Sequence, residues 1–189
     1  MILTFYDTET SGLDTAAADI HQFAYIRFDT QHGILKARDF YLWEDNYDWS
    51  EGAYKVNGLS KEFLKANGAP DIQQKYQEMF TVMSRAYEVG YNNNRYDRPL
   101  VDHFLMRHAI MPEPQQASID VMLVAQKAFG KRFKLVDLCA RFGFAPEQIE
   151  AFTKAIFKRA GTCAHDAAYD TMATYMCFMK LREAGYVQV

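Results

Sequence analysis

Two carboxylates, Asp7 and Glu9, stand two residues apart at the end of an apolar amino-terminal segment, MILTFYDTE. In a β-strand, side chains two residues apart point to the same face, so these carboxylates are expected side by side. Like charges held together destabilise a sheet unless a positive charge lies between them. One interpretation is a divalent cation, since Mg²⁺ binds a few carboxylates together with water and phosphate oxygens. The alternative is a solvated strand end, because acidic residues are common near turns and Ser11-Gly12 follows.

Three further residues that could do chemistry follow later in the chain. Asp97 comes just before Pro99, so it either caps a helix or serves a site at the end of the preceding buried strand. His165 and Asp170 form an H-x4-D spacing at the start of the last expected helix. Taken singly, His165 fits a surface loop and Asp170 a solvated helix position. Those interpretations do not explain why both occur after Asp7, Glu9 and Asp97 in this order.

The segments FYDTETSGLD, GYNNNRYD and AHDAAYD resemble the three sequence motifs of the DEDDh, or DnaQ-like, 3′-5′ exonucleases. The segments SIDVMLVA and KLVDLCARFG are similar to the family's sequence between its second and third motifs. KVNGLSKEF resembles the family's V-H-G-I segment, although Asn57 stands where histidine is usual. Within the family, the motifs are most similar to the catalytic domain of the bacterial exonuclease I branch.

The resemblance implies an RNase H-like α/β fold. Its sheet would have five strands, three antiparallel and then parallel ones, with helices on both faces. It also implies metal-dependent hydrolysis of phosphodiester bonds from the 3′ end of nucleic acid, with release of nucleoside 5′-monophosphates. Asp7, Glu9, Asp97 and Asp170 would bind two Mg²⁺ or Mn²⁺ ions roughly 4 Å apart. His165 would take the proton from the attacking water, a role that suits histidine because its unperturbed pKa is about 6.5.

Four residues near the motifs are candidates for substrate binding. By analogy with the family, Thr10 would approach the 3′-hydroxyl and Leu13 would pack against the terminal base. An ordinary core position is the alternative for Leu13. Asn93 either contacts the scissile region or fixes its own loop. Tyr96 replaces the phenylalanine that is more frequent in the motif and keeps an aromatic ring there.

Capture of a nucleic-acid strand needs stacking surfaces and positive charge. Phe129 and Phe133 lie among basic residues, and a second basic group precedes His165. The basic residues are Lys127, Lys131, Arg132, Lys134, Lys154, Lys158 and Arg159. Solvated helix faces are an equally good explanation for each of them.

The expected partner is nucleic acid with a free 3′ end, with single-stranded DNA favoured over RNA. The alternatives are an RNA-end-trimming or oligoribonuclease-type exoribonuclease, a proofreading module bound to a polymerase, and a scaffold domain that has lost the chemistry. The complete motif set counts against the scaffold. No H-E-x-x-H or cysteine–histidine set supports an unrelated metallohydrolase. A contact to the 2′-hydroxyl would separate RNA from DNA, and the sequence leaves that choice and the oligomeric state open.

Length and composition predict one globular domain over residues 1–189. The chain has 49% hydrophobic and 24% charged residues, which is ordinary globular usage. Its net charge of −3 argues against binding nucleic acid through bulk positive charge, although bound divalent metals reverse the field of a carboxylate site. The three cysteines, Cys139, Cys163 and Cys177, show no metal-like spacing. Without a signal peptide or an apolar run of about 20 residues, a reduced, cytoplasmic protein without membrane attachment is expected.

Hydrophobic periodicity predicts the elements that position these residues. Strands are predicted over 2–9, 19–29 and 34–43 as an antiparallel meander, and further strands over 86–92 and 117–121. A loop is predicted over 44–58. Helices are predicted from Ser60, over 71–85 with Asp71 as its cap, from Asp97, and over 120–129, 134–142, 147–159 and 165–184. This order is typical of a mixed sheet covered by helices.

Overall fold

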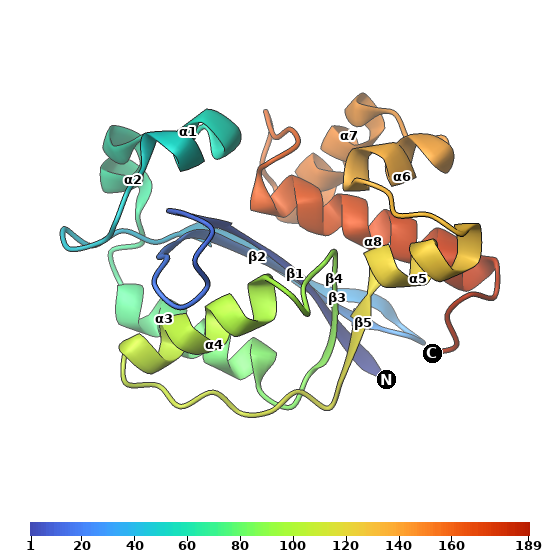
Figure 1. Cartoon of the computed structure of the whole chain (residues 1–189), viewed down its shortest axis with the longest axis horizontal. Helices are drawn as coiled ribbons and strands as arrows, with labels where there is room; N and C mark the ends of the chain where they lie inside the picture. The colour runs from blue at the N-terminus through green and yellow to red at the C-terminus, as the bar shows by residue number, and fades with distance from the viewer.

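A five-stranded mixed sheet forms the centre of the computed structural model, which describes residues 1–189 (Figure 1). The strand order is β3-β2-β1-β4-β5. The antiparallel part consists of β1 (Ile2–Thr10), β2 (Ile20–Asp29) and β3 (Gly33–Tyr41). The parallel part adds β4 (Tyr87–Gly90) and β5 (Ala117–Asp120) to β1. The predicted fold class is therefore confirmed.

Helices cover both faces of this sheet. They are α1 (Glu51–Asn57), α2 (Lys61–Asn67), α3 (Ile72–Met83), α4 (Asp97–Arg107), α5 (Val121–Phe129), α6 (Leu135–Arg141), α7 (Pro146–Phe157) and α8 (Ala167–Glu183). Figure 1 shows α3 and α4 on one face and α5 to α8 on the other, with α1 and α2 near the end of β1. None of these helices combines the length and the apolar character that crossing a bilayer requires.

The prediction of a continuous loop over residues 44–58 is wrong, because residues 51–57 form α1. The Ser50 side chain accepts a hydrogen bond from the Ala53 N–H at 3.1 Å. Gly58 ends the helix with a φ of 69°, a conformation that glycine adopts without strain. Local caps define this short helix, whereas none of its residues is buried. Asp71 occupies the cap position of α3, but its side chain makes no capping bond.

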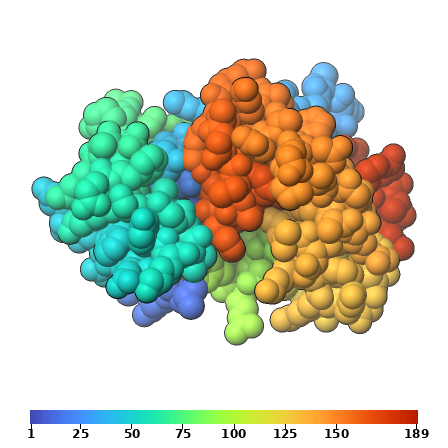
Figure 2. Space-filling view, turned by 90° about the horizontal axis from the view of Figure 1, so that it is seen from above, coloured from blue at the N-terminus to red at the C-terminus, as the bar shows by residue number.

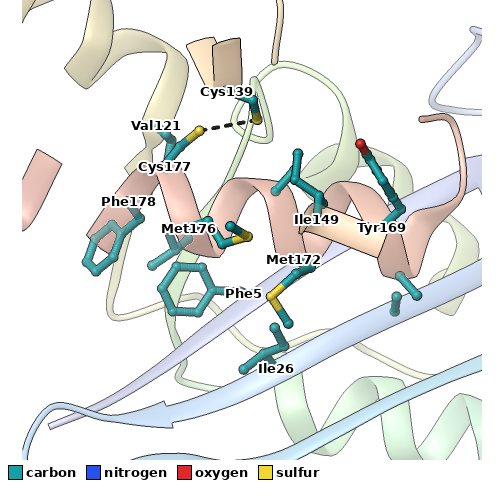
Figure 3. Close-up of a cluster of buried hydrophobic side chains, with 14 of the residues drawn as sticks. Phe5, Ile26, Val121, Cys139, Ile149, Tyr169, Met172, Met176, Cys177 and Phe178 are labelled. Carbon is teal, nitrogen blue, oxygen red and sulfur yellow. Dashed lines mark hydrogen bonds between the residues drawn. The ribbon is translucent and has the colours of Figure 1, made fainter. Parts of the chain in front are cut away.

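Alternation along β1 divides its side chains between two hydrophobic clusters. Leu3 and Phe5 pack into the cluster formed with α8, where Phe5 lies against Phe178 with ring centroids 5.0 Å apart (Figure 3). Tyr6 belongs to the cluster on the opposite face, with α3 and α4. Because successive side chains point to opposite faces, Asp7 and Glu9 continue the α8 side.

The carboxyl end of β1 is the point where the site elements meet. Since β4 runs parallel to β1, both strands end at the same edge of the sheet. The loop after β4 turns back into α4, and it passes so close to Gly90 that a Cβ there would lie 2.5 Å from the Asn93 Cβ. Helix α8 also begins at this edge, packed on β1 and β2 (Figure 1). The edge therefore receives the starts of two helices as well as the end of β1.

Cys139 of α6 and Cys177 of α8 face each other in the α8 cluster, with Sγ atoms 3.5 Å apart (Figure 3). Both are buried, and all three cysteines of the chain are free thiols.

Candidate functional site

Three of the predicted acidic residues converge at the carboxyl end of β1. Asp7, Glu9 and Asp170 each offer a carboxylate oxygen, and these oxygens lie within 4.8 Å of one another. Asp7 and Glu9 come from one face of β1, and Asp170 comes from the first turn of α8. Residues 161 positions apart in the chain are thus brought together by the packing of α8 on that face.

Asp97 approaches the same place from the other side of β1. It is the first residue of α4, and its Oδ1 accepts a hydrogen bond of 2.7 Å from the Thr8 hydroxyl. Thr8 points away from Asp7 and Glu9 because side chains alternate along the strand. Asp97 is outside the group of three close oxygens, yet among the neighbouring carboxylates its charge is the largest contribution to the raised pKa of Asp7.

Burial, together with repulsion from neighbouring carboxylates, raises the pKa of each of these four carboxyls; for Asp97 that neighbour is Asp120. Burial is the main cause at every one of them. The pKa of Asp97 rises to about 6 and that of Asp170 to about 7. For Asp7 and Glu9 the pKa lies well above the usual range, since neighbouring carboxylates add to the effect of burial. Ionising all four carboxyls at once is therefore unfavourable in the metal-free protein.

The donor set fits divalent metal ions of the hard, oxygen-binding kind. Oxygen ligands at this separation and charge are what Mg²⁺ and Mn²⁺ bind. The two arginines nearest in sequence to Asp97 and Asp170 form ion pairs with other carboxylates. Arg98 pairs with Glu88 and Asp102, and Arg159 pairs with Asp39 and Asp166. Buried like charges without a cationic side chain between them are unfavourable. A bound cation would remove this repulsion.

His165 lies in the loop immediately before α8. Its backbone N–H donates a hydrogen bond of 3.1 Å to Oδ2 of Asp170, so the histidine backbone is attached directly to the carboxylate group. The residue is exposed and has a φ of 66°, a left-handed conformation that is uncommon for residues other than glycine. The helix cap is the next residue, Asp166, whose side chain accepts bonds from the Ala168 and Tyr169 amides.

A cleft of about 460 Å³ opens beside Glu9. The end of β1 forms one wall, α1 forms the other, and Tyr96 at the start of α4 closes it. In the space-filling view, the α1–α2 segment and the segment before α8 stand on either side of a hollow (Figure 2). Leu13 is 88% exposed and Val56 58% exposed at this cleft. The core position considered for Leu13 is therefore excluded.

Thr10 and Tyr96 line the cleft and hold each other in place. Their hydroxyl groups are 2.9 Å apart, and the Tyr96 hydroxyl donates to the Gly12 carbonyl at 2.5 Å. Thr10 itself is buried, and its hydroxyl lies 2.8 Å from the Gly12 carbonyl, so its one proton is shared between that oxygen and the Tyr96 oxygen. Both hydroxyls fix the turn after β1, which sets the position of Leu13.

Asn93 is fully buried, and its amide donates a hydrogen bond of 3.1 Å to the Ser118 hydroxyl. Of the two roles expected for it, fixing the loop between β4 and α4 is the one that this geometry supports. A direct contact of its side chain with a substrate does not fit this burial.

The aromatic residues proposed as a stacking surface, Phe129 and Phe133, are partly buried and pack against other side chains of the protein. Phe129 and Phe133 contact each other with ring centroids 5.9 Å apart and adjoin the α8 cluster. The Arg141 guanidinium lies 4.1 Å from the centroid of Phe129. The two rings therefore support α5 and α6.

Sequence reasoning missed helix α1 as a wall of the cleft, with Ala53, Val56 and Asn57. The Asn57 amide donates to the Thr10 carbonyl at 3.3 Å, and its Oδ1 accepts from the Leu59 amide at 3.0 Å. Ser50 and Gly58, as capping residues, were the available signals for this helix.

The raised pKa values predict how the metal-free protein responds to pH. Unfolded aspartates have a pKa of about 3.9, whereas Asp97 and Asp170 titrate near 6 and 7 in the folded state. Between pH 4 and 7 the folded state therefore binds more protons, so its stability falls as the pH rises. We expect a lower melting temperature at pH 8 than at pH 5 in EDTA, measured by calorimetry.

The variant Asp170→Asn is the control, because it removes one carboxyl of the cluster and leaves the other titrating groups of the protein in place. It should be more stable than wild type at pH 8 and show a smaller pH dependence. An unchanged pH dependence in this variant would mean that the carboxylate cluster is not its source.

Comparison with known proteins matches residues 4–178 to the family model RNase T, described as Exonuclease. Exodeoxyribonuclease I of Escherichia coli (strain K12) is 25% identical over 183 residues, which are 89% of this chain and 36% of that protein. Exodeoxyribonuclease I of Buchnera aphidicola is 30% identical over 112 residues, which are 57% of this chain and 27% of that protein. The chain thus spans between a quarter and two fifths of these relatives.

Solved structures of exonuclease I share the fold. One superimposes with a TM-score of 0.75 and 22% identity, covering 96% of this chain and 41% of that one. The structure of the E. coli enzyme with a dA16 oligonucleotide gives a TM-score of 0.74, also at 22% identity and with coverage of 96% and 41%. The sheet with order 3-2-1-4-5 and its helices is therefore the RNase H-like fold of these exonucleases.

Proposed function

Because this chain belongs to the RNase T family of exonucleases, we propose that it is a metal-dependent 3′-5′ exonuclease acting on single-stranded DNA. The observation that carries the proposal is the convergence of Asp7, Glu9 and Asp170 within 4.8 Å, with Asp97 beside them. These residues lie in the segments that resemble the acidic motifs of the DEDDh exonucleases. The preference for DNA rests on relatives named exodeoxyribonuclease I and on the structure with dA16.

In the proposed mechanism, Asp7, Glu9, Asp97 and Asp170 would hold two divalent ions, Mg²⁺ or Mn²⁺. Such ions would stabilise the negative charge that develops on the phosphate and lower the pKa of the attacking water. His165 accepts the proton of that water at an imidazole nitrogen. Its backbone bond to Asp170 keeps the residue that carries the imidazole next to the carboxylates. The water oxygen bonds to phosphorus while the bond to the 3′-oxygen of the preceding nucleotide breaks; that oxygen takes up a proton, and the 3′-terminal nucleotide leaves as a nucleoside 5′-monophosphate.

The cleft beside Glu9 is the proposed binding place of the 3′-terminal nucleotide. It adjoins the carboxylates and offers the exposed apolar side chains of Leu13 and Val56. A nucleobase that packs on them would remove their surface from water. Thr10 and Tyr96 present oxygen atoms on the same wall, where the sugar would lie.

We take residues 1–189 as one exonuclease domain, since helices on both faces share a single sheet.

Digestion of 5′-labelled oligonucleotides tests the proposal. Single- and double-stranded DNA and RNA are incubated with the purified chain in Mg²⁺, Mn²⁺ or EDTA. We expect single-stranded DNA to shorten from its 3′ end only when metal is present, and a 3′-phosphate to block digestion. Faster digestion of RNA would assign the chain to RNA-end trimming instead. Rapid digestion of free oligonucleotides would also argue against a module that works only on a polymerase.

Truncation of Leu13 should weaken substrate binding without weakening the fold. In Leu13→Ala we expect KM for a single-stranded oligonucleotide to rise about tenfold, because burying part of a leucine on binding contributes about 1.5 kcal/mol. The free energy of unfolding should change by less than about 0.5 kcal/mol, as is usual for exposed positions. Leu35→Ala, at an exposed leucine on the far end of β3, is the matched control. Equal KM values for both variants would remove Leu13 from the binding site.

A further inference from the structure

A buried polar network connects the loop that carries His165 to the sheet. Arg159 forms ion pairs with Asp39 of β3 and with Asp166, the cap of α8. The side chains of these three residues are 26%, 11% and 14% exposed, respectively. The guanidinium also lies 5.1 Å from the centroid of the Tyr41 ring. An arginine that bridges two carboxylates and stacks on a ring is held far more firmly than an arginine in a solvated ion pair.

Gln22 completes this network from β2. It is fully buried, and its Nε2 lies 3.3 Å from a carboxylate oxygen of both Asp39 and Asp166. Its Oε1 accepts a bond of 3.1 Å from the Ala167 amide at the start of α8. Both ends of the Gln22 side chain are therefore hydrogen-bonded, the amide oxygen to the start of α8 and the amide nitrogen to Asp166 and Asp39.

Strand register places the network directly beside the carboxylate site. Glu9 pairs with Gln22, and Gln22 pairs with Tyr41, so these three side chains form one row across the sheet. Asp7, Ala24 and Asp39 form the neighbouring row. Cross-strand neighbours lie on one face with Cβ atoms about 5 Å apart. The face that carries the proposed metal ligands thus continues into the face that carries the anchor.

His165 immediately precedes the anchored Asp166 and has a left-handed backbone. Its only backbone attachment to the site is the 3.1 Å bond from its N–H to Asp170. A residue in this conformation keeps it only when the surroundings hold it. Because Arg159 pairs with both Asp166 and Asp39, it fixes the residue after His165 to strand β3.

We infer that Arg159 is a positioning residue that fixes His165 relative to the carboxylates through Asp39, Asp166 and Gln22. The inference rests on the proposed function, in which His165 is the base. It replaces the expectation that Arg159 binds a substrate phosphate, because both sides of its guanidinium are engaged by carboxylates. It also explains why Arg159 is the one basic residue before His165 that reaches across to β3.

The test compares Arg159→Ala and Arg159→Lys with wild type on a 5′-labelled single-stranded oligonucleotide. We expect kcat to fall 10- to 100-fold in Arg159→Ala, since a displacement of about 1 Å in a catalytic group has an effect of this size. KM should stay within about twofold. Arg159→Lys should recover only part of kcat, because one ammonium group cannot bridge two carboxylates as a guanidinium does.

Hydrogen exchange of the metal-free protein gives a readout that needs no activity. Amides of residues 160–168 should exchange faster in Arg159→Ala, while those of β1 and β2 should not change. If the exchange changes as expected but the wild-type protein digests no oligonucleotide, the proposed function is wrong, whereas the role of Arg159 in holding residues 160–168 is supported. Asp39→Asn, which keeps the side-chain size, should show the same changes to a smaller degree and serves if Arg159→Ala does not fold. Arg85→Ala removes an exposed ion pair with Glu113 and should change none of these values.

Two results would overturn the inference. A raised KM with unchanged kcat, together with a weaker dependence of KM on salt, would make Arg159 a phosphate ligand. Unchanged exchange over residues 160–168 in both Arg159→Ala and Asp39→Asn would show that the network does not hold the loop.

Discussion

Asp7→Asn should abolish the stabilisation of the protein by Mn²⁺ and Mg²⁺ and reduce turnover by about three orders of magnitude or more. Asp7 belongs to the group of three close carboxylates, and burial together with the charges of Asp97 and Asp170 raises its pKa. An amide provides a neutral ligand in place of a charged one, which lowers metal affinity. Loss of several kcal/mol of charge stabilisation corresponds to a loss of turnover of this size.

The melting temperature with and without Mn²⁺ is the measurement for this variant. Ligands that bind only the folded state raise its stability with concentration, so wild type should show a shift that grows with Mn²⁺. In EDTA at pH 8, Asp7→Asn should melt higher than wild type, because one of the closely spaced carboxylates is removed. A higher melting temperature in EDTA would show that the variant still folds and has lost only the metal site. Asp45→Asn, at a side chain that is 96% exposed, controls for the chemical change. An unchanged Mn²⁺ shift in Asp7→Asn would refute a site built on Asp7.

His165→Ala should lower turnover by about two to four orders of magnitude, the usual range for a general base. Folding and metal binding should remain largely intact. The residue is exposed, and its bond to Asp170 comes from the backbone N–H, which alanine retains. Steady-state digestion rates, the melting temperature and the Mn²⁺ shift are measured together. A loss confined to kcat identifies the proton transfer as the affected step.

His165→Asn is the matched variant, because asparagine tolerates the left-handed backbone at this position better than alanine does. It should be as inactive as His165→Ala, which would exclude backbone strain as the cause. His32→Ala changes an exposed histidine on the turn between β2 and β3 and should leave turnover unchanged. If His165→Asn retained turnover within a few-fold of wild type, His165 would have no part in the mechanism.

The sheet was predictable from sequence because its signals are local and repetitive. β-Branched and aromatic residues are concentrated along β1 and β2, and turn residues stand between the strands. Because side chains of a strand point alternately to its two faces, Asp7 and Glu9 were predicted to share a face. Helix α1 was not predictable in this way. It buries no residue, so it has no hydrophobic periodicity, and only its capping residues indicate it.

The chemical character of the site also came from sequence, whereas its assembly did not. The types of Asp7, Glu9, Asp97 and Asp170 indicated a metal site, because carboxylate chemistry belongs to the residues themselves, and the resemblance of the segments around them to the DEDDh motifs indicated an exonuclease. From sequence alone, Arg159 could not be distinguished from Lys154 and Lys158 as a candidate phosphate ligand, since all three are basic and close together.

Tertiary structure decided which of these groups meet. Packing of α8 on β1 brings Asp170 to Asp7 and Glu9, while the Thr8 hydroxyl holds Asp97 on the opposite face. Strand register places Asp39 within reach of Arg159, which turns that residue from an expected phosphate ligand into an internal anchor. Distances between residues far apart in the chain depend on register and helix packing, and these are set by the burial of whole faces rather than by any local pattern.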